Sequence, residues 1–308
     1  MKRSVLTITA MGVALAAVTA ACSSSGTGSS SPGTVANASA ATVDSVVKGR
    51  TLTLATDANY PPCEYYEGTS KKTMIGFEPE IWAAIAQRIG VTLKVENTQF
   101  DNLIPGVQSG RYDLAMECIS DRAERQKQVT FVDFIYAETS VVTRSDHTGA
   151  ITADDPLSIC GLKMGAQSGF DTISFVQETI NPACGKAGKS QIDVKAFPSA
   201  ADTYNALYSA RVDFIILDSA AAAYLNKSAP VQLKRYANSQ LEKLYLGAVF
   251  KPAETDLQRA WLAGLQAIIS DGSYAAILKK WDIADLALTD PGMNLATTRP
   301  IAKASPGS

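Results

Sequence analysis

Short β-type runs alternate with segments of helical periodicity through this chain, and this alternation limits the possible folds more than any other feature. Residues 52–56 form an apolar β-type run. Isoleucines then recur at helical spacing, at Ile81, Ile85 and Ile89. A second β-type run follows at residues 91–95. Strands that alternate with helices pair in parallel and are covered by helices on both faces, so the pattern predicts an α/β fold.

The same order of elements recurs later in the chain. Residues 162–166 and 192–196 are expected strands, with an expected helix at residues 171–179 between them. Ser109-Gly110-Arg111-Tyr112-Asp113 before one strand also resembles Ser209-Ala210-Arg211-Val212-Asp213 before another. This repetition predicts two similar lobes.

Two extended apolar segments, residues 139–143 and 244–250, are suited to cross from one lobe to the other and back. Two crossings predict a hinge of two strands. The expected division is lobe 1 at residues 49–138 and 244–287, lobe 2 at residues 139–243, and a flexible polar tail at residues 288–308.

The amino-terminal segment has the order of a secretory signal. Two basic residues precede an apolar run at residues 5–18, and small residues then lead to Cys22. A cysteine after two alanines resembles a bacterial lipobox, so we expect a signal at residues 1–21 and a diacylated Cys22; ordinary signal cleavage is the alternative. Residues 22–48 begin with a Ser- and Gly-rich stretch that is typical of a flexible linker. We expect lipid anchoring on the extracytoplasmic face of the cell membrane.

Composition excludes several classes of function. The net charge is −2 without a long charged block, which gives no support to nucleic-acid binding. The body lacks a second apolar stretch near the roughly 20 residues that a spanning helix needs. His147 is the only histidine, and neither a Ser/His/Asp set nor a phosphate-binding glycine loop is apparent. We expect a monomer without metal or cofactor.

Four cysteines remain when the amino-terminal one is set aside, an even number for an exported chain. Cys63, Cys118, Cys160 and Cys184 permit three pairings, and the sequence alone does not decide among them. Cys160 and Cys184 flank one expected strand and helix, so we favour that pair. Cys63 with Cys118 then follows by elimination. No Cys-x-x-Cys is present, so the spacing fits neither a zinc site nor a redox pair.

Polar side chains cluster just after the expected strands. Ligands of open α/β sheets bind at the carboxyl ends of parallel strands, so these residues are candidates for a binding site. They are Asp57, Tyr60, Glu64, Glu117, Cys118, Ser120, residues 167–171 and Asp218.

Charged and aromatic candidates each have a structural alternative. The Arg125 guanidinium matches a carboxylate, although an arginine in a charged helical turn is more often solvated. Asp218 can hold an ammonium group or cap the following helix. Amides after Gly169 precede an expected helix and can bind an anion. Tyr60 and Phe100 can flank a ligand or receive a cation, with core packing as the alternative for Phe100.

Four motifs follow one another through the body in a specific order and spacing. They are residues 56–62 with 76–78, residues 100–105 with 109–113, residues 124–131, and residues 211–213 with 217–219. This set resembles the family-3 extracellular solute-binding proteins, the polar amino-acid receptors of ABC importers. The resemblance implies a two-lobed, periplasmic-binding-protein-like fold of type II, whose lobes are joined by two hinge strands and close on a ligand.

The resemblance also implies roles for matching residues. Arg125 would grip the α-carboxylate of the ligand, helped by amides near Gly169 and Phe170. Asp218 would bind the α-ammonium group. Tyr60 and Phe100 would flank the side chain of the ligand. Ser120 and the Cys118 backbone would complete the site for its α-amino group.

The chain departs from the family pattern in two regions. Ser168-Gly169-Phe170-Asp171 stands where Ser-Gly-Thr-Thr is common, so hydroxyl contacts are lost while the amides remain. Cys63 replaces a usual aromatic and Cys118 a small residue, and this paired replacement supports a bond between them.

Glu117 also replaces a small residue, and with Glu64 and Asp57 it can make the side-chain pocket acidic. An acidic pocket favours a cationic ligand such as arginine, lysine, ornithine or a related cation.

We therefore expect an extracytoplasmic substrate-binding lipoprotein that delivers an amino acid or similar small zwitterion to an ABC permease, with a cationic ligand favoured. One alternative is a hydro-lyase that resembles cyclohexadienyl dehydratase, with Glu64 or Glu117 as acid or base. The other is a ligand-sensing module that signals to a partner protein.

Overall fold

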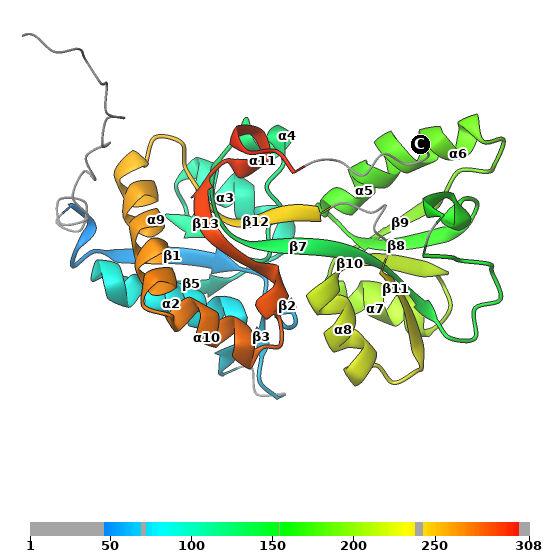
Figure 1. Cartoon of the computed structure of the whole chain (residues 1–308), viewed down its shortest axis with the longest axis horizontal. Helices are drawn as coiled ribbons and strands as arrows, with labels where there is room; N and C mark the ends of the chain where they lie inside the picture. The colour runs from blue at the N-terminus through cyan, green and yellow to red at the C-terminus, as the bar shows by residue number, and fades with distance from the viewer. Residues whose placement is uncertain (1–45, 69–71, 154, 238–242, 302–308) are drawn as a thin grey trace, which may run out of the picture. The chain divides into compact units, whose positions relative to one another are not determined.

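The structure is a computed structural model (Figure 1), and it describes residues 46–68, 72–153, 155–237 and 243–301. The expected signal sequence and Cys22 lie outside the described residues, as do most of the expected linker and the end of the expected tail. Within the described ranges, no helix is long and apolar enough to cross a membrane.

Strands and helices alternate along the described chain, as the sequence predicts. Their order is β1 (Thr51–Thr56), β2 (Asn59–Tyr60), β3 (Glu64–Tyr66), β4 (Met74–Ile75), α2 (Phe77–Ile89), β5 (Thr92–Asn97), η1 (Phe100–Asn102), α3 (Leu103–Ser109), β6 (Leu114–Ala115), α4 (Ala123–Gln126), β7 (Thr130–Arg144), η2 (Pro156–Ile159), β8 (Lys163–Gln167), α5 (Asp171–Phe175), η3 (Val176–Ile180), α6 (Asn181–Lys186), β9 (Asp193–Phe197), α7 (Ala200–Tyr208), β10 (Phe214–Asp218), α8 (Ser219–Ser228), β11 (Leu233–Ala237), β12 (Lys243–Phe250), α9 (Thr255–Ser270), α10 (Ser273–Lys280), η4 (Ala284–Leu286), β13 (Ala287–Met293) and α11 (Leu295–Thr298).

The first set of parallel strands is formed by β1, β5 and β6, with β1 in the middle. Leu54 of β1 is fully buried, and so are Ile81 and Ile85 of α2, because the helix turns its isoleucine face to the core. The helix α9 packs against α2 (Figure 1). Gly264 permits this close packing, since an added Cβ atom would lie 2.8 Å from Ile89 Cγ2. The isoleucine pattern of the sequence is therefore a packing surface.

The second set of parallel strands is β8, β9 and β10, with β8 in the middle. Met164 of β8 and Phe214 of β10 are fully buried. The helix α7 begins at a capping residue, because the Ser199 hydroxyl accepts a hydrogen bond from the Asp202 amide at 3.1 Å. Both sets therefore repeat the same arrangement of strand, helix and strand.

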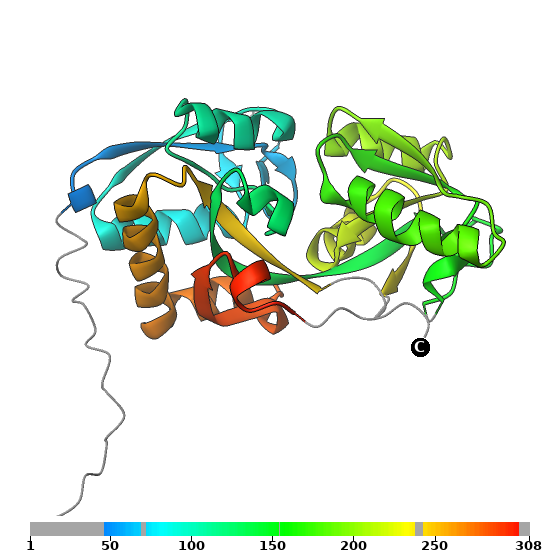
Figure 2. The same cartoon turned by 90° about the horizontal axis from the view of Figure 1, so that it is seen from above.

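One long strand, β7, joins the two sets. Its first part pairs with β12 and its second part pairs with β10, both antiparallel. Figures 1 and 2 show β7 running from the first set of strands to the second. The expected crossing segments fall in these strands, residues 139–143 in β7 and residues 244–250 in β12. The lobe boundaries at residues 138/139 and 243/244 stay a prediction.

Two disulfides tie loops to this framework. Cys160 is bonded to Cys184 and Cys63 to Cys118, with Cα–Cα distances of 5.8 and 6.2 Å. These are the pairings that the sequence favours.

The prediction of a flexible tail from residue 288 onward is wrong for the first part of this segment. Strand β13 pairs with β7, and the short helix α11 follows it. Leu288 and Leu295 are buried, at 1% and 6% exposure. The Leu295 amide donates to Asp133 Oδ2 at 2.8 Å, and the Asn294 side chain accepts from the Phe131 amide at 2.8 Å. Leu288 and Leu295 stand alone in a polar stretch and show no periodicity. The sequence therefore contains no sign that the fold buries them.

Candidate functional site

The candidate site lies where strand ends from both lobes meet. A cavity of about 40 Å³ is found there. Seven of the ligand-binding residues expected from the sequence line it, namely Tyr60, Phe100, Cys118, Ser120, Arg125, Phe170 and Asp218. Gly169 lines a larger neighbouring cavity, which shares Arg125 and Phe170 with the small one. The other three, Asp57, Glu64 and Glu117, are buried.

Asp218 connects the two lobes at one end of the cavity. Its Oδ1 atom accepts the Ala221 amide at 2.8 Å and so caps α8, while its Oδ2 atom accepts the Tyr60 hydroxyl at 2.6 Å. Burial raises the pKa of Asp218, although the hydrogen bonds from Tyr60 and from backbone amides oppose this effect. Asp218 thus caps α8 and lines the cavity at the same time, whereas helix capping and ligand binding are alternatives on the sequence alone.

Arg125 connects the lobes at the other end. Its guanidinium donates to the Ser120 carbonyl at 3.0 Å, to Ser120 Oγ at 2.7 Å and to the Gly169 carbonyl at 2.9 Å. The guanidinium also lies over the Phe100 ring, 5.6 Å from its centroid. Burial lowers the pKa of Arg125, but a guanidinium stays protonated in proteins. Arg125 is therefore a partly buried positive charge with fixed hydrogen-bond partners and does not belong to a solvated helix face.

Phe170 lies between the two aromatic residues that were expected to flank a ligand. Its ring centroid is 4.7 Å from that of Phe100 and 5.5 Å from that of Tyr60, with edge-on geometry in both pairs. The Phe170 amide, which was expected to meet an anion, donates to the Gln167 carbonyl at 3.2 Å. The sequence indicated only the amide of this residue and missed its ring, which contributes to the small size of the cavity.

Asp57 holds several segments around the site together. Its carboxylate accepts hydrogen bonds from Asn59 Nδ2 at 2.7 Å, from the Phe100 amide at 3.2 Å and from Gln167 Nε2 at 3.0 Å. Burial raises the pKa of Asp57, and these hydrogen bonds act in the opposite direction. The bond to Gln167 reaches β8 in lobe 2, so Asp57 also links the lobes.

Glu117 has the most unusual environment in the site. It is 1% exposed, and neither of its carboxylate oxygens has a hydrogen-bond partner among the described residues. Burial raises the pKa of Glu117 well above its usual range, and nearby Asp57 and Glu78 raise it further, whereas Arg125 lowers it. Such surroundings favour the protonated, uncharged form of the carboxyl group, and a cation close to it favours the ionised form.

A pair of acids lies buried next to the Cys63–Cys118 disulfide. The carboxyl group of Glu64 has no hydrogen-bond partner among the described residues, and Glu78 Oε1 accepts the Cys118 amide at 2.7 Å. Burial raises the pKa of Glu78 to about 7 and that of Glu64 well above its usual range. The sequence did not single out Glu78 as a site residue, although it belongs to the motif at residues 76–78. Within the described ranges, no group of His, Cys, Asp and Glu side chains is arranged to hold a metal ion.

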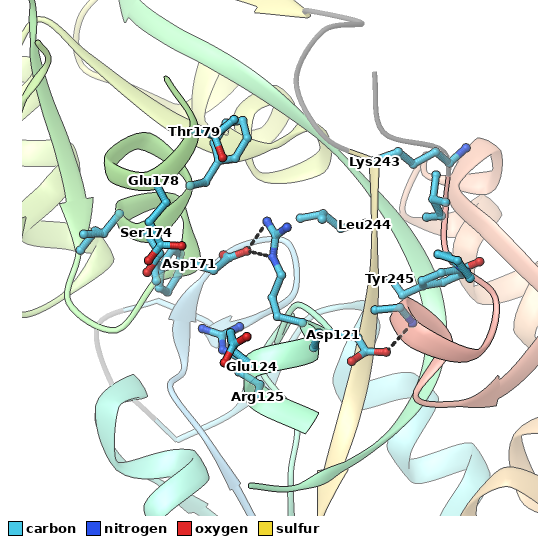
Figure 3. Close-up of a pocket in the computed structure, with 18 of the residues that line it drawn as sticks. Asp121, Glu124, Arg125, Asp171, Ser174, Glu178, Thr179, Lys243, Leu244 and Tyr245 are labelled. Atoms are coloured by element: carbon cyan, nitrogen blue, oxygen red, sulfur yellow. Dashed lines mark hydrogen bonds and ion pairs between the residues drawn. The ribbon is translucent and has the colours of Figure 1, made fainter. Parts of the chain in front are cut away.

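The larger cavity has a volume of about 660 Å³ and is shown in Figure 3. It lies between α4, the segment around α5, the beginning of β12 and the residues after α11. Arg122 and Asp171 both line this cavity, and Arg122 Nε donates a hydrogen bond to Asp171 Oδ2 at 2.6 Å. Arg125, Phe170 and Asp171 line both cavities. The two cavities are therefore neighbours, and the charged residues Arg125 and Asp171 belong to the wall between them.

Comparison with known proteins agrees with this architecture. Residues 52–283 match the bacterial extracellular solute-binding proteins, family 3. The chain is 26% identical over 249 residues to the arginine-binding protein ArgT of Corynebacterium glutamicum, covering 79% of this chain and 78% of that protein. It is 24% identical over 238 residues to the L-cystine-binding protein TcyJ of Escherichia coli (strain K12), covering 77% and 84%.

The fold is also found in a solved structure of an ancestral arginine-binding protein bound to glutamine. That structure superposes with a TM-score of 0.66 at 26% identity, covering 76% of this chain and 98% of the other. The family match spans most of the body, including the strand ends that form the cavity. The chain therefore belongs to the bacterial extracellular solute-binding proteins of family 3, the amino-acid-binding proteins of ABC transporters, and has their two-lobed α/β fold.

Proposed function

We propose that this chain captures a basic amino acid or a closely related small cation between its lobes and delivers it to the permease of an ABC importer. The lobes would close around the ligand through the two strands β7 and β12. Tyr60, Phe100 and the backbone of Cys118 would help to enclose the ligand, as the family resemblance implies.

The buried carboxyl group of Glu117 supports a cationic ligand more directly than any other group. An ionised carboxylate that is buried without a partner is strongly unfavourable, so the surroundings of Glu117 favour its protonated form. An ammonium or guanidinium group placed beside it would stabilise the ionised form. Glu117 directly precedes Cys118, which lines the cavity, so Glu117 would thereby favour positive ligand groups there.

Two residues of opposite charge line the cavity. Asp218, with Tyr60 as its hydrogen-bond donor, offers a partly buried acceptor for an ammonium group. Arg125, supported by Ser120, offers a partly buried guanidinium for an anionic group of the ligand. This polarity supports a small ligand that is held at both ends.

The names of similar proteins support the ligand class but not one ligand. ArgT is named for arginine, TcyJ for L-cystine, and the ancestral arginine-binding protein was solved with glutamine. The preference for a cation comes from the acidic side chains of this chain.

Calorimetric titration of the full chain tests this proposal. Arginine, lysine and ornithine should bind, whereas glutamate should not. Glu117→Gln removes the charge and keeps the shape, so it should weaken binding of the cations at least about tenfold, equal to about 1.4 kcal/mol. Glu254→Gln is the matched control, because this exposed glutamate lies at the start of α9. Binding of glutamate or alanine without binding of the cations would contradict the proposal.

We propose further that the chain is a monomeric lipoprotein, anchored through Cys22 on the extracytoplasmic face of the membrane. The order of charged, apolar and small residues before Cys22 supports this location. Mass spectrometry of the mature amino terminus should find a diacylated cysteine. Cys22→Ser should release the protein from the membrane, and an unmodified Cys22 would contradict anchoring.

Binding without turnover is the activity we propose. Incubation with prephenate, followed by absorbance, should give no product. Product formation that Glu117→Gln abolishes would instead favour the hydro-lyase alternative.

A further inference from the structure

Asp171 places a negative charge at the end of the cleft where Arg125 lies. It is the first residue of α5 and lines both cavities. Arg122, just before α4, donates to Asp171 Oδ2 through Nε at 2.6 Å, and its Nη2 atom is also 2.6 Å from that oxygen. The two side chains are only 25% and 18% exposed. The ion pair joins lobe 1 to lobe 2, and its two side chains are largely shielded from water (Figure 3).

Asp171 is ionised in this setting. Burial acts to raise the pKa of Asp171, but the charges of Arg122 and Arg125, with hydrogen bonds from Arg122 and Ser120, outweigh burial and lower it below its usual value. Burial lowers the pKa of Arg125, and the charge of Asp171 acts in the opposite direction. Three hydrogen bonds of the guanidinium go to Ser120 and Gly169.

The chemistry of Asp171 differs from that of a hydroxyl residue at the same place. A threonine hydroxyl at this position could donate a hydrogen bond to a ligand carboxylate. An ionised aspartate has no donor and repels that carboxylate. A ligand carboxylate brought to Arg125 would therefore lie beside a like charge in a site with little water to screen it.

We propose that Asp171 is a specificity-determining residue, an internal carboxylate that occupies the anion-binding end of the cleft, so that the chain prefers small dications without a free carboxylate. Aliphatic diamines and aminoalkylguanidines have this chemistry. Asp218 would receive one cationic end and Glu117 the other. This inference rests on the proposed cation-binding function and narrows its ligand class.

Arginine and agmatine are suitable probes, because agmatine is arginine without its carboxylate. We expect the full chain to bind agmatine at least about tenfold more tightly than arginine in calorimetric titrations, a difference of about 1.4 kcal/mol. Asp171→Thr should lower this preference at least about tenfold, because a donor replaces the carboxylate. A role of Asp171 in lobe closure alone would change both affinities alike and leave their ratio constant.

Asp256→Asn is the matched control, since Asp256 forms an exposed ion pair with Arg259 on α9 and its replacement should leave the ratio unchanged. Asp171→Asn provides a second variant if Asp171→Thr does not fold. The ratio of the affinities for agmatine and arginine in the unaltered chain is itself a test. Arginine binding as tightly as agmatine, or an equal ratio in folded Asp171 variants, would overturn the inference and leave the proposed function intact. Failure of both probes to bind would instead refute the proposed cation-binding function.

Discussion

The buried carboxyl pair of Glu64 and Glu78 predicts that the unliganded protein is more stable in mild acid than at neutral pH. Both side chains are fully buried, and the charge of Glu78 adds to the effect of burial in raising the pKa of Glu64. Burial raises the pKa of Glu78 from 4.5 to about 7. In the unfolded chain the same group ionises at its ordinary pKa, so between these two values the folded state binds more protons than the unfolded state.

The sign and size of the effect follow from this difference. The free energy of unfolding should fall as pH rises from 4.5 to about 7, by about 1.4 kcal/mol per pH unit. Glu78 alone therefore accounts for a loss of about 3 kcal/mol across this window, and it causes no further loss above it. Glu64 and Glu117 act in the same direction, because burial raises the pKa of each.

Urea unfolding of the full chain at several pH values between about 5 and 8 measures this loss. Glu78→Gln should flatten the dependence of the unfolding free energy on pH. Glu80→Gln, a partly exposed neighbour on the same helix, should leave that dependence unchanged. An unfolding free energy that rises from mild acid to neutral pH in the unaltered chain would refute this reasoning.

Three further predictions concern stability and are measured by the same unfolding experiment. Replacing Cys63 and Cys118 together by alanine should cost about 4 kcal/mol, because the bond closes a loop with a sequence separation of 55 residues, and unchanged stability would contradict this. Gly264→Val should destabilise the contact between α9 and α2 by about 2 kcal/mol, since an added Cβ atom already meets Ile89, and a neutral effect would argue against this close packing. Leu295→Ala should cost about 2 kcal/mol if the residues after β13 pack as described, whereas a mobile segment would show no loss.

Local patterns explain what could be predicted from the sequence. The isoleucine spacing of α2 and the β-type run of β1 depend on neighbouring residues only, so the alternation of elements is visible in the letters. The positions of Tyr60 and Asp218 follow from the rule that strand ends form ligand sites in α/β sheets. The long strand β7 was recognised only in part, because its pairing with both β12 and β10 depends on distant segments.

What could not be predicted depends on contacts between residues far apart in the chain. Phe170 reaches the space between Tyr60 and Phe100 only after the two lobes have formed. Glu78 resembles an ordinary acidic residue in the first turn of a helix, and its burial results from contact with the disulfide loop. The ion pair between Arg122 and Asp171 joins residues 49 positions apart. None of these contacts has a periodic signal.

The central claim, capture of a cation beside buried Glu117, is tested most directly by counting protons in a titration with arginine. Burial favours the protonated Glu117 carboxyl group in the unliganded protein and a bound cation favours the ionised form, so binding should release a proton. The count is obtained from binding enthalpies in two buffers of different ionisation enthalpy. The account predicts this release for the unaltered chain and its loss in Glu117→Gln. Binding without proton release, or the same release in Glu117→Gln, would contradict the account.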